Sequence, residues 1–425
     1  MANQLARFVL SGLVVSNFAF ADAEKVPDWN EQTLFGDWGG TRSDLYNKGV
    51  NFEFIHKSDM LANISGGIKR GSAWMGNTEA GVRFNLEKSL GWDATTAYIH
   101  FHSQLGDKFN RDYVGSFVGV DNIESGTNTG QFNHAWIQRS FSGEKLSLLA
   151  GLYAIDSEFY VTDTSGIFLQ PPYGMANDMA QSGKNGPPIF PVGAFAVRVK
   201  YNSLGKAYLQ AVLTDGVPGD PNDHRGTHIK LGNGDGTLSV VEFGHIPQRV
   251  DTSPESTWQG NHEDGEYFNK TAVGVWRYSA RFHDLDPANT SLYSSQGAYF
   301  LAERTLAVEK DHPAQGLSGF VRFGVASKDI HQSDWTGSLG VRYHGMIANR
   351  DDDIAGMAVT ISHASTKYRF LNNAASSQID AEATYRAQIS PWLALQPSLQ
   401  YISNPNMDAA LEDVWLVGVR LEVVF

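Results

Sequence analysis

The chain has 425 residues, with 33 Lys and Arg against 46 Asp and Glu, and a formal net charge of −13. This charge argues against nucleic acid as a partner, because the phosphate backbone would be repelled. The chain has no Cys, which excludes disulfide scaffolds, thiolate metal sites and cysteine nucleophiles. The 43 Gly and the 12% aromatic share favour sheets and turns over helix bundles, so we expect an all-β protein.

The first residues have the layout of a secretory signal peptide. An apolar stretch follows Arg7, and the small residues Ala21 and Ala23 offer cleavage points. A membrane anchor would need about 20 unbroken apolar residues, whereas polar residues interrupt this shorter stretch. We therefore expect residues 1–23 to be a signal peptide that exports the protein.

Alternation of apolar and polar residues with a period of two runs through the rest of the chain. Between 378 and 390, for example, Ile379 and Ala381 share one face while Asp380 and Glu382 share the other. The pattern predicts sixteen strands, at 52–62, 77–88, 94–105, 131–142, 145–154, 193–202, 206–214, 238–246, 267–279, 297–306, 317–327, 336–346, 355–365, 378–390, 392–403 and 413–425. Most of these segments are long enough to cross a bilayer at a tilt, which takes about 9–11 residues, whereas soluble strands average about 5–6.

The connections between these segments differ in length. Tight links occur at 142–145, 202–206 and 389–392, and long polar ones at 106–130, 155–192, 215–237, 247–266 and 280–296. Short turns at one end and long loops at the other are typical of a bacterial outer-membrane barrel, and a soluble sandwich would not need this asymmetry. Beyond residue 25 no segment has the length of a spanning helix, so a membrane protein with this sequence requires a closed barrel. We expect a transmembrane antiparallel β-barrel of about sixteen strands.

The last segment supports this interpretation. In residues 413–425 every second residue from Trp415 to Phe425 is apolar or aromatic. A soluble core strand would also alternate, but it leaves the terminal Phe425 unexplained. A strand that closes a barrel and ends on an interfacial aromatic residue explains both features.

A family resemblance becomes visible directly after the signal. The stretch TLFGDWGGTRSDLYNKGVNFEF, residues 33–54, resembles the N-terminal signature of the OprB-type carbohydrate-selective porins. Supporting matches lie at 64–67, 84–92, 151–159, 195–202 and 215–221 and at the terminal phenylalanine. Locally, Thr41 is expected to cap a short helix that Gly49 ends. The resemblance implies a helical periplasmic segment at 24–50, a sixteen-stranded barrel at 51–425, loops that narrow the lumen, and passage of monosaccharides such as glucose.

Strand parity selects the residues expected to face the lumen. They are Glu79, Arg83, Tyr98, His100, His102, Arg198, Lys200, Glu242, Arg322, Arg342, Asp380, Glu382, Arg386, Arg420 and Glu422. The long loop at 155–192 is expected to fold inward, bringing Asp156, Glu158, Phe159, Phe168 and Tyr173. Arginine forks and carboxylates bind sugar hydroxyls, and aromatic rings cover the C–H face of the sugar. As pore-lining, sugar-contacting residues we select Arg83, Asp156, Glu158, Arg198, Lys200, Arg322, Arg342 and Arg386. The alternative is that these inward charges only line a water-filled channel and neutralise one another, which would produce the same alternation along the strands.

Signals for other chemistry are weaker. His100 and His102 lie two apart on one strand face, but a third metal ligand is not evident. Residues 231–242 nearly fit a calcium-binding EF-hand loop, except that Leu231 stands where Asp is needed. The chain has no GxSxG stretch. We therefore expect neither an enzyme nor a cofactor or metal.

The favoured function is passive, carbohydrate-selective diffusion across the bacterial outer membrane, with small sugars and outer-membrane lipid as partners. A general diffusion porin without sugar preference, and a secreted polysaccharide-binding β-protein, remain alternatives. The oligomeric state is open, with a homo-oligomer among the possibilities.

Overall fold

The computed structural model describes residues 26–143, 145–203, 207–232, 234–246, 268–310, 312 and 314–425. The predicted signal peptide and the predicted long connection at 247–266 lie outside the described residues.

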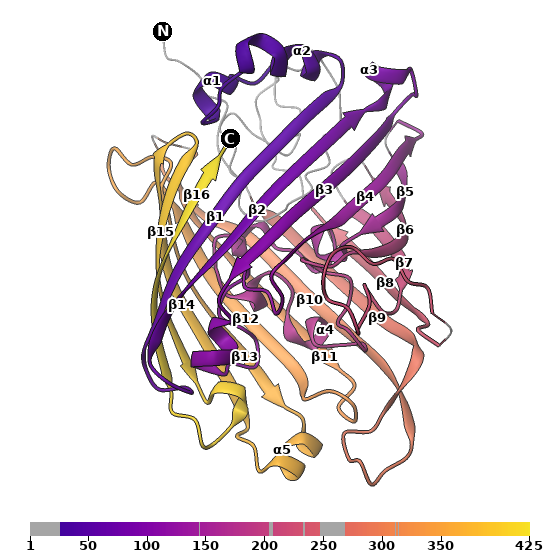
Figure 1. Cartoon of the computed structure of the whole chain (residues 1–425), viewed down its shortest axis with the longest axis vertical. Helices are drawn as coiled ribbons and strands as arrows, with labels where there is room; N and C mark the ends of the chain where they lie inside the picture. Colours follow the sequence, from indigo (N-terminus) through magenta and orange to yellow (C-terminus); the bar gives the residue numbers. More distant parts are fainter. Residues whose placement is uncertain are drawn as a thin grey trace.

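Sixteen antiparallel strands form one closed barrel, in which sequence neighbours pair and β1 pairs with β16 (Figure 1). The strands are β1 Val50–Ser65, β2 Gly71–Asn85, β3 Thr95–Gly106, β4 Thr129–Phe141, β5 Leu146–Tyr153, β6 Ala194–Asn202, β7 Ala207–Asp215, β8 Thr237–His245, β9 Asn269–His283, β10 Leu292–Val308, β11 Gly316–Ala326, β12 Ser333–His344, β13 Ile354–Ala364, β14 Ser377–Ser390, β15 Leu393–Ser403 and β16 Val414–Val424. Each predicted segment overlaps one of them, so the predicted fold class and strand number are confirmed. Closure leaves no unpaired sheet edge.

Alternate side chains along each strand face the inside and the outside of the barrel. On β6, Arg198 is buried whereas Val197 and Val199 are exposed. On β14, Asp380 and Glu382 are buried. The outer surface therefore carries rows of apolar side chains, while polar and charged groups fill the inside, as the period of two requires.

The two ends of the barrel carry different connections. The C-terminus and the first described residues, from 26 onward, lie at the end shown at the top of Figure 1, which we call the turn end; the opposite end is the loop end. The longest loop-end connections within the described residues are 107–128 and 154–193. The predicted long loop at 280–296 is wrong, because strand pairing between β9 and β10 continues through most of it and leaves only 284–291. β8 ends at His245 and β9 begins at Asn269, both at the turn end, so the chain leaves more than short turns between strands at this end too.

In the part of the chain that the structure describes, five short α-helices accompany the barrel: α1 Trp29–Gln32, α2 Thr41–Asn47, α3 Leu86–Leu90, α4 Asn177–Ala180 and α5 Thr366–Asn372. The predicted cap by Thr41 is wrong, since the carboxylate of Asp37 accepts the backbone N–H of Ser43 at 2.8 Å instead. Gly49 does follow the end of α2; its φ is 87° and an added Cβ would lie 2.5 Å from a backbone oxygen. None of the helices that the structure describes is long and apolar enough to span a bilayer.

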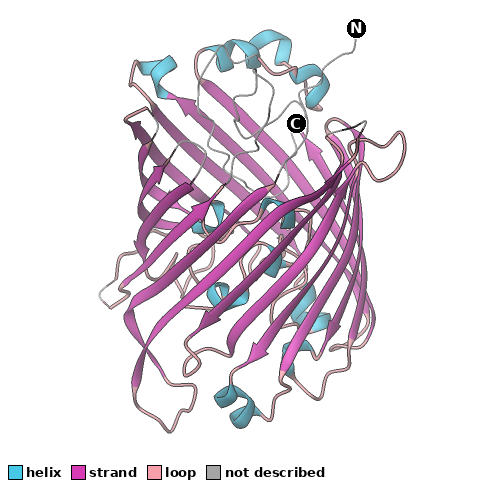
Figure 2. Cartoon of the chain, turned by 180° about the vertical axis from the view of Figure 1, so that it is seen from behind, coloured by secondary structure: helices cyan, strands magenta, loops and turns pink. Residues whose placement is uncertain are grey.

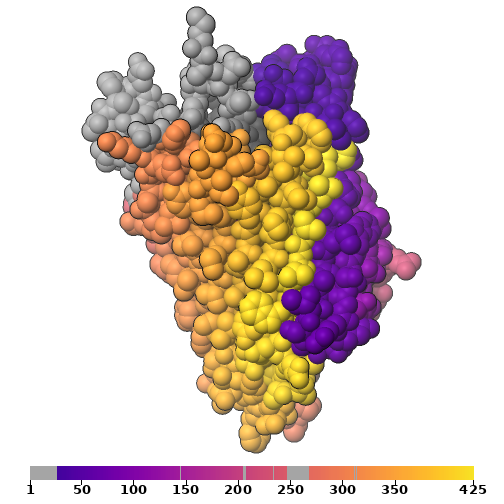
Figure 3. Space-filling model, turned by 90° about the vertical axis from the view of Figure 1, so that its left-hand side faces the viewer, coloured from indigo at the N-terminus to yellow at the C-terminus, as the bar shows by residue number. Residues whose placement is uncertain are grey.

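The seam between the first and last strands lies beneath the N-terminal helices. Figure 3 shows β16 in yellow beside β1 in indigo, with the indigo N-terminal segment at the rim above them. Figure 2 shows that loops and short helices occupy the interior between the walls. In that interior, Phe159, Tyr160 and Met179 pack against Trp276 and Tyr299 of the wall.

Candidate functional site

The loop at 154–193 folds into the barrel and is fastened to the wall through its backbone. The carboxylate of Glu382 on β14 accepts the N–H of Leu169 at 2.8 Å. On β11, the guanidinium of Arg322 donates to the carbonyl of Tyr173 at 2.7 Å. Loop N–H and C=O groups have no sheet partner, so these wall side chains supply the hydrogen bonds that a buried backbone needs.

A charged clamp holds the start of this loop. Arg198 Nε donates to Glu158 Oε2 at 2.8 Å, and Lys200 Nζ lies 3.4 Å from Glu158 Oε1. The hydroxyl of Tyr153 donates to the same carboxylate at 2.6 Å. Burial alone would raise the pKa of Glu158, but the adjacent Arg198 and Lys200 lower that pKa to about 2. Glu158 is therefore ionised throughout the neutral range.

Glu242 on β8 forms a second anchor. Its carboxylate accepts from the N–H of Tyr160 at 2.9 Å and from the hydroxyls of Tyr208 and Tyr299, each at 2.7 Å. The rings of Tyr160 and Tyr299 stack with their centroids 3.9 Å apart. The EF-hand interpretation needs this same Glu242 as a calcium ligand, yet here its oxygens serve the loop and the tyrosines.

A second loop, 107–128, also enters the lumen. Arg420 on β16 donates to both carboxylate oxygens of Asp59, at 2.9 and 2.6 Å, and to the Asn122 side chain at 2.7 Å. The N–H of Asn122 donates to the carbonyl of Leu169 in the other loop at 2.7 Å. The two loops therefore meet inside the barrel and narrow it together.

Three of the selected cations keep an edge toward water. The side chains of Arg83, Lys200 and Arg386 are 15%, 17% and 11% exposed. All three lie on inward positions toward the turn end of their strands. Arg83 lies 4.6 Å from the ring of Tyr98, and Arg386 Nη2 lies 2.8 Å from a carboxylate oxygen of Glu422. Each of these cations is thus partly exposed and has an aromatic or acidic neighbour.

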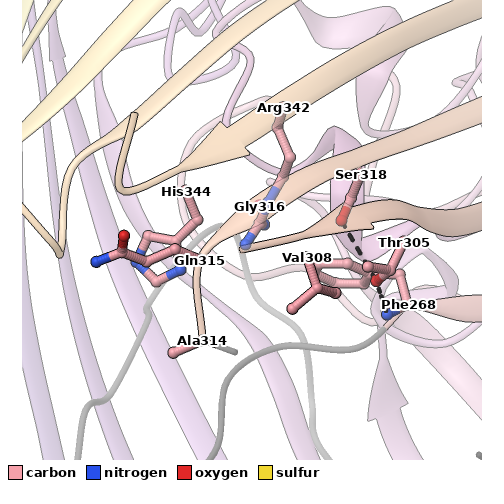
Figure 4. A pocket seen from close by; sticks show the side chains of 9 residues that line it. All are labelled: Phe268, Thr305, Val308, Ala314, Gln315, Gly316, Ser318, Arg342 and His344. Atoms are coloured by element: carbon pink, nitrogen blue, oxygen red, sulfur yellow. Dashed lines mark hydrogen bonds between the residues drawn. The ribbon is translucent and has the colours of Figure 1, made fainter. Parts of the chain in front are cut away.

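A small recess opens at the turn end of the inner wall (Figure 4). It is lined by Phe268, Thr305, Val308, Ala314, Gln315, Gly316, Ser318, Arg342 and His344. The guanidinium of Arg342 lies 4.6 Å from the ring centroid of Phe268, and the hydroxyl of Ser318 donates to that of Thr305 at 3.4 Å. The recess combines a planar cation, hydroxyls and an aromatic face, but its volume of about 10 Å³ has room for a single water molecule and not for a sugar ring.

The selected residues thus separate into two groups. Four hold the loop in place: Glu158, Arg198, Arg322 and Asp156, the last accepting the N–H of Phe190 at 3.0 Å. Burial raises the pKa of Asp156 to about 6. The other four lie toward the turn end: Arg83, Lys200 and Arg386 at the water, and Arg342 in the recess.

Some anchoring residues were not selected from the sequence. Glu303 accepts the N–H of Thr164 at 2.9 Å, and Gln396 donates to the carbonyl of Ile167 at 2.7 Å. Both occupy inward positions of their strands, so parity could have placed them in the lumen. Their loop partners, however, could not be read from the alternation.

The two histidines on β3 take part in hydrogen bonds within the wall. His100 Nδ1 lies 2.5 Å from Asn133 Oδ1, and its Nε2 lies 3.3 Å from Glu79 Oε2. His102 Nε2 donates to the carbonyl of Pro191 at 2.8 Å, which ties down the returning part of the loop. Across the described residues, no three His, Cys, Asp or Glu side chains gather as metal ligands would.

A closed sixteen-stranded barrel with a polar interior narrowed by in-folded loops defines a porin. Residues 69–425 match the model of the carbohydrate-selective porin, OprB family, and the chain belongs to that family. It is therefore a sugar-selective porin of the bacterial outer membrane.

Two relatives align over nearly their whole length. Porin B of Pseudomonas aeruginosa is 23% identical over 458 residues, covering 98% of this chain and 96% of the relative. The putative porin QuiX of Acinetobacter baylyi is 23% identical over 439 residues, covering 93% and 94%.

Solved structures share the fold. The high-pH structure of Pseudomonas putida OprB has a TM-score of 0.82 at 18% identity and covers 95% of this chain and 100% of that one. The channel DcaP of Acinetobacter baumannii has a TM-score of 0.53 at 10% identity, with 88% and 97% covered.

Proposed function

We propose that this porin passes monosaccharides such as glucose by passive diffusion, without covalent chemistry, cofactor or metal. The observation that supports this proposal most strongly is the division of labour among the inward charges. Glu158, Arg198 and Arg322 fix the loops that narrow the lumen, while Arg83, Lys200 and Arg386 keep edges at the water. A neutral sugar permeates such a passage by exchanging water for weak, multiple hydrogen bonds that it can leave again.

The arrangement of the molecule in the membrane follows from the same reasoning. Residues 1–23 act as the signal peptide, residues 24–50 form the N-terminal segment, and residues 51–425 form the barrel. The outward apolar rows contact lipid. The turn end, which carries the C-terminus and the segment that begins at residue 26, faces the periplasm, and the loop end faces the medium.

The proposed sugar contacts are the three turn-end cations that keep an exposed part, Arg83, Lys200 and Arg386; the fourth, Arg342, is 2% exposed. Each has an aromatic ring or a carboxylate beside it: Tyr98 beside Arg83, for example, and Glu422 beside Arg386. A guanidinium can donate to two neighbouring hydroxyls while the adjacent carboxylate accepts from a third.

Planar-bilayer conductance with a panel of neutral sugars as blockers tests this function. Arg83→Ala and Arg386→Ala are expected to weaken glucose block by about 10-fold each, the size of one lost hydrogen bond to a charged group. Arg139→Ala is the matched control, because Arg139 is exposed on β4 and should leave the block unchanged. Block that depends only on sugar size, and that none of these changes affects, would identify a general diffusion porin instead.

A further inference from the structure

The segment Thr33–Gly40 is attached directly to the barrel seam, and we call it the lip. The N–H of Leu34 donates to the carbonyl of Val424 at the end of β16, at 2.9 Å. The ring of Phe35 lies 5.0 Å from the ring of Phe425. The lip therefore follows the rim at the turn end above the seam seen in Figure 3.

Ring contacts show that the lip lies against the outer surface of the barrel and not across the lumen. On β1 the odd-numbered residues face inward, because Asp59 is buried and contacts Arg420 on the neighbouring strand β16 inside the barrel. Phe52 and Phe54 are therefore on the outward row. The ring of Trp38 lies 5.7 Å from Phe52, and the ring of Phe425 lies 4.9 Å from Phe54.

Three large apolar side chains of the lip remain uncovered. Leu34, Phe35 and Trp38 are 42%, 60% and 42% exposed. They continue the apolar outward row of β16 past the rim through the ring of Phe425, whereas His56 and Ser58 interrupt the outward row of β1 below Phe54. Isolated exposed apolar residues are ordinary, but an aromatic cluster continuous with the outer band of a membrane barrel marks an interaction surface.

The lip is held in this position by Arg42. Its Nη1 donates to the carbonyl of Phe425 at 3.0 Å and its Nη2 to the carbonyl of Phe52 at 2.8 Å. The guanidinium also lies 4.0 Å from the ring of Trp29. Arg42 Nη1 also donates to the hydroxyl of Thr33 in the lip at 3.2 Å, so one buried cation joins the lip to both strands of the seam.

We propose that the lip is an interfacial anchor that binds the phospholipid surface of the inner leaflet. Leu34, Phe35 and Trp38 insert at headgroup depth, where amphipathic and aromatic side chains are favoured, while Lys48 beyond α2 stays in water. The inference rests on the proposed orientation, in which the turn end faces the periplasm. It gives the N-terminal segment a membrane role that the barrel alone does not supply.

Single-cysteine labelling tests the anchor, because the chain contains no Cys of its own. Phe35→Cys carries an environment-sensitive fluorophore in the full chain, reconstituted into phosphatidylethanolamine and phosphatidylglycerol vesicles with or without nitroxide-labelled lipids. Lys48→Cys is the water-side control, and Met357→Cys, exposed on the outer wall of β13, is the lipid-side control. Shallow nitroxides are expected to quench the Phe35 label several-fold more than the Lys48 label.

Two results would overturn the proposal. In the first, aqueous iodide quenches the labels at positions 35 and 48 equally, and nitroxide lipids quench neither. In the second, lipid quenching of the Phe35 label vanishes as protein is diluted in the bilayer, which would show that a second copy covers the lip. Leu34→Cys repeats the measurement if Phe35→Cys does not fold. Sugar flux through the same vesicles separates the two proposals, since a water-exposed lip with normal flux rejects only the anchor.

Discussion

Replacing Arg198 by alanine removes the guanidinium that holds Glu158, and with it the start of the in-folded loop. Arg198 is 1% exposed and donates to both oxygens of the Glu158 carboxylate, at 2.8 and 3.2 Å. In the variant only Lys200 remains as a cationic neighbour, at 3.4 Å. A buried carboxylate is then left largely uncompensated, which is the costly way to break a buried ion pair.

The magnitude follows from the pKa of Glu158, which lies at about 2 against an ordinary 4.5. A shift of this size corresponds to about 3 kcal/mol of stabilisation of the ionised form, in line with about 3–5 kcal/mol for breaking buried pairs. Because the pKa is depressed, this stabilisation is fully present above about pH 4.5 and is lost only as the pH falls through about 2. The wild-type protein should therefore show no dependence on Glu158 between pH 8 and pH 5.

In Arg198→Ala the balance reverses. Burial now raises the pKa of Glu158, so mild acid neutralises the stranded carboxylate. The loop can avoid the penalty by detaching from the wall, because the strand hydrogen bonds of the barrel do not depend on it. We expect higher single-channel conductance and weaker sugar block at pH 7, both partly restored at pH 5, with the heat-modifiable folded band retained.

Bilayer conductance and sugar block at pH 5, 7 and 8 measure this effect. Arg139→Ala, at an exposed site on β4, is the matched control and should behave as wild type. The double variant Arg198→Ala with Glu158→Gln should lose the pH dependence. Unchanged conductance and block in Arg198→Ala at pH 7 would refute the clamp, and a pH response that survives in the double variant would refute the role of Glu158.

Three further changes probe other parts of the molecule. Gly324→Ala should lower the free energy of unfolding by about 1–3 kcal/mol, because the added Cβ would lie 2.2 Å from a carboxylate oxygen of Asp178. Gly337→Ala is the control: its Cβ would lie 3.7 Å from the nearest atom, in the ring of Trp335, and the urea midpoint should not change. Burial raises the pKa of Asp178 to about 7, so the folded wild type loses stability as the pH rises from about 4 to about 7 and this buried carboxyl ionises. Asp178→Asn should abolish that loss of stability, and an identical pH profile in both proteins would contradict this. Arg42→Ala loses the bond to the Phe425 carbonyl and should cost about 2 kcal/mol in urea titrations, whereas an unaltered midpoint would show that the seam needs no N-terminal tie.

The strands were predictable because alternation is a local property. A residue at an even or odd position meets lipid or lumen by the pleat alone, so Asp380 and Glu382 could be assigned inward from sequence. The rule fails where the ladder is irregular. On β4 the register shifts opposite His100, and both Asn133 and His134 are buried. Parity cannot place two consecutive residues on one face, which is why His134 was not a candidate.

The site was only partly predictable, because facing inward does not decide what a side chain meets. Arg198 and Lys200 lie two apart on β6, and both are cations at inward positions of the same strand. Arg198 is nevertheless buried against the loop, whereas the side chain of Lys200 is 17% exposed. The difference comes from the path of 154–193, which no local pattern encodes. Loop length indicated that the segment could fold inward, but not which wall residues it would cover.

The backbone of the in-folded loop explains why the inner wall carries buried acidic residues. Glu242, Glu303 and Glu382 lie on three different strands, and each accepts a loop N–H at 2.8–2.9 Å. A chain segment without sheet partners brings many N–H groups into the lumen, and buried donors must find acceptors. These carboxyl groups are therefore engaged by the fold and are withdrawn from any passing solute. Selectivity is left to the side chains that keep an exposed part, which among the selected residues are Arg83, Arg386 and Lys200, the last of which also pairs with Glu158 of the loop.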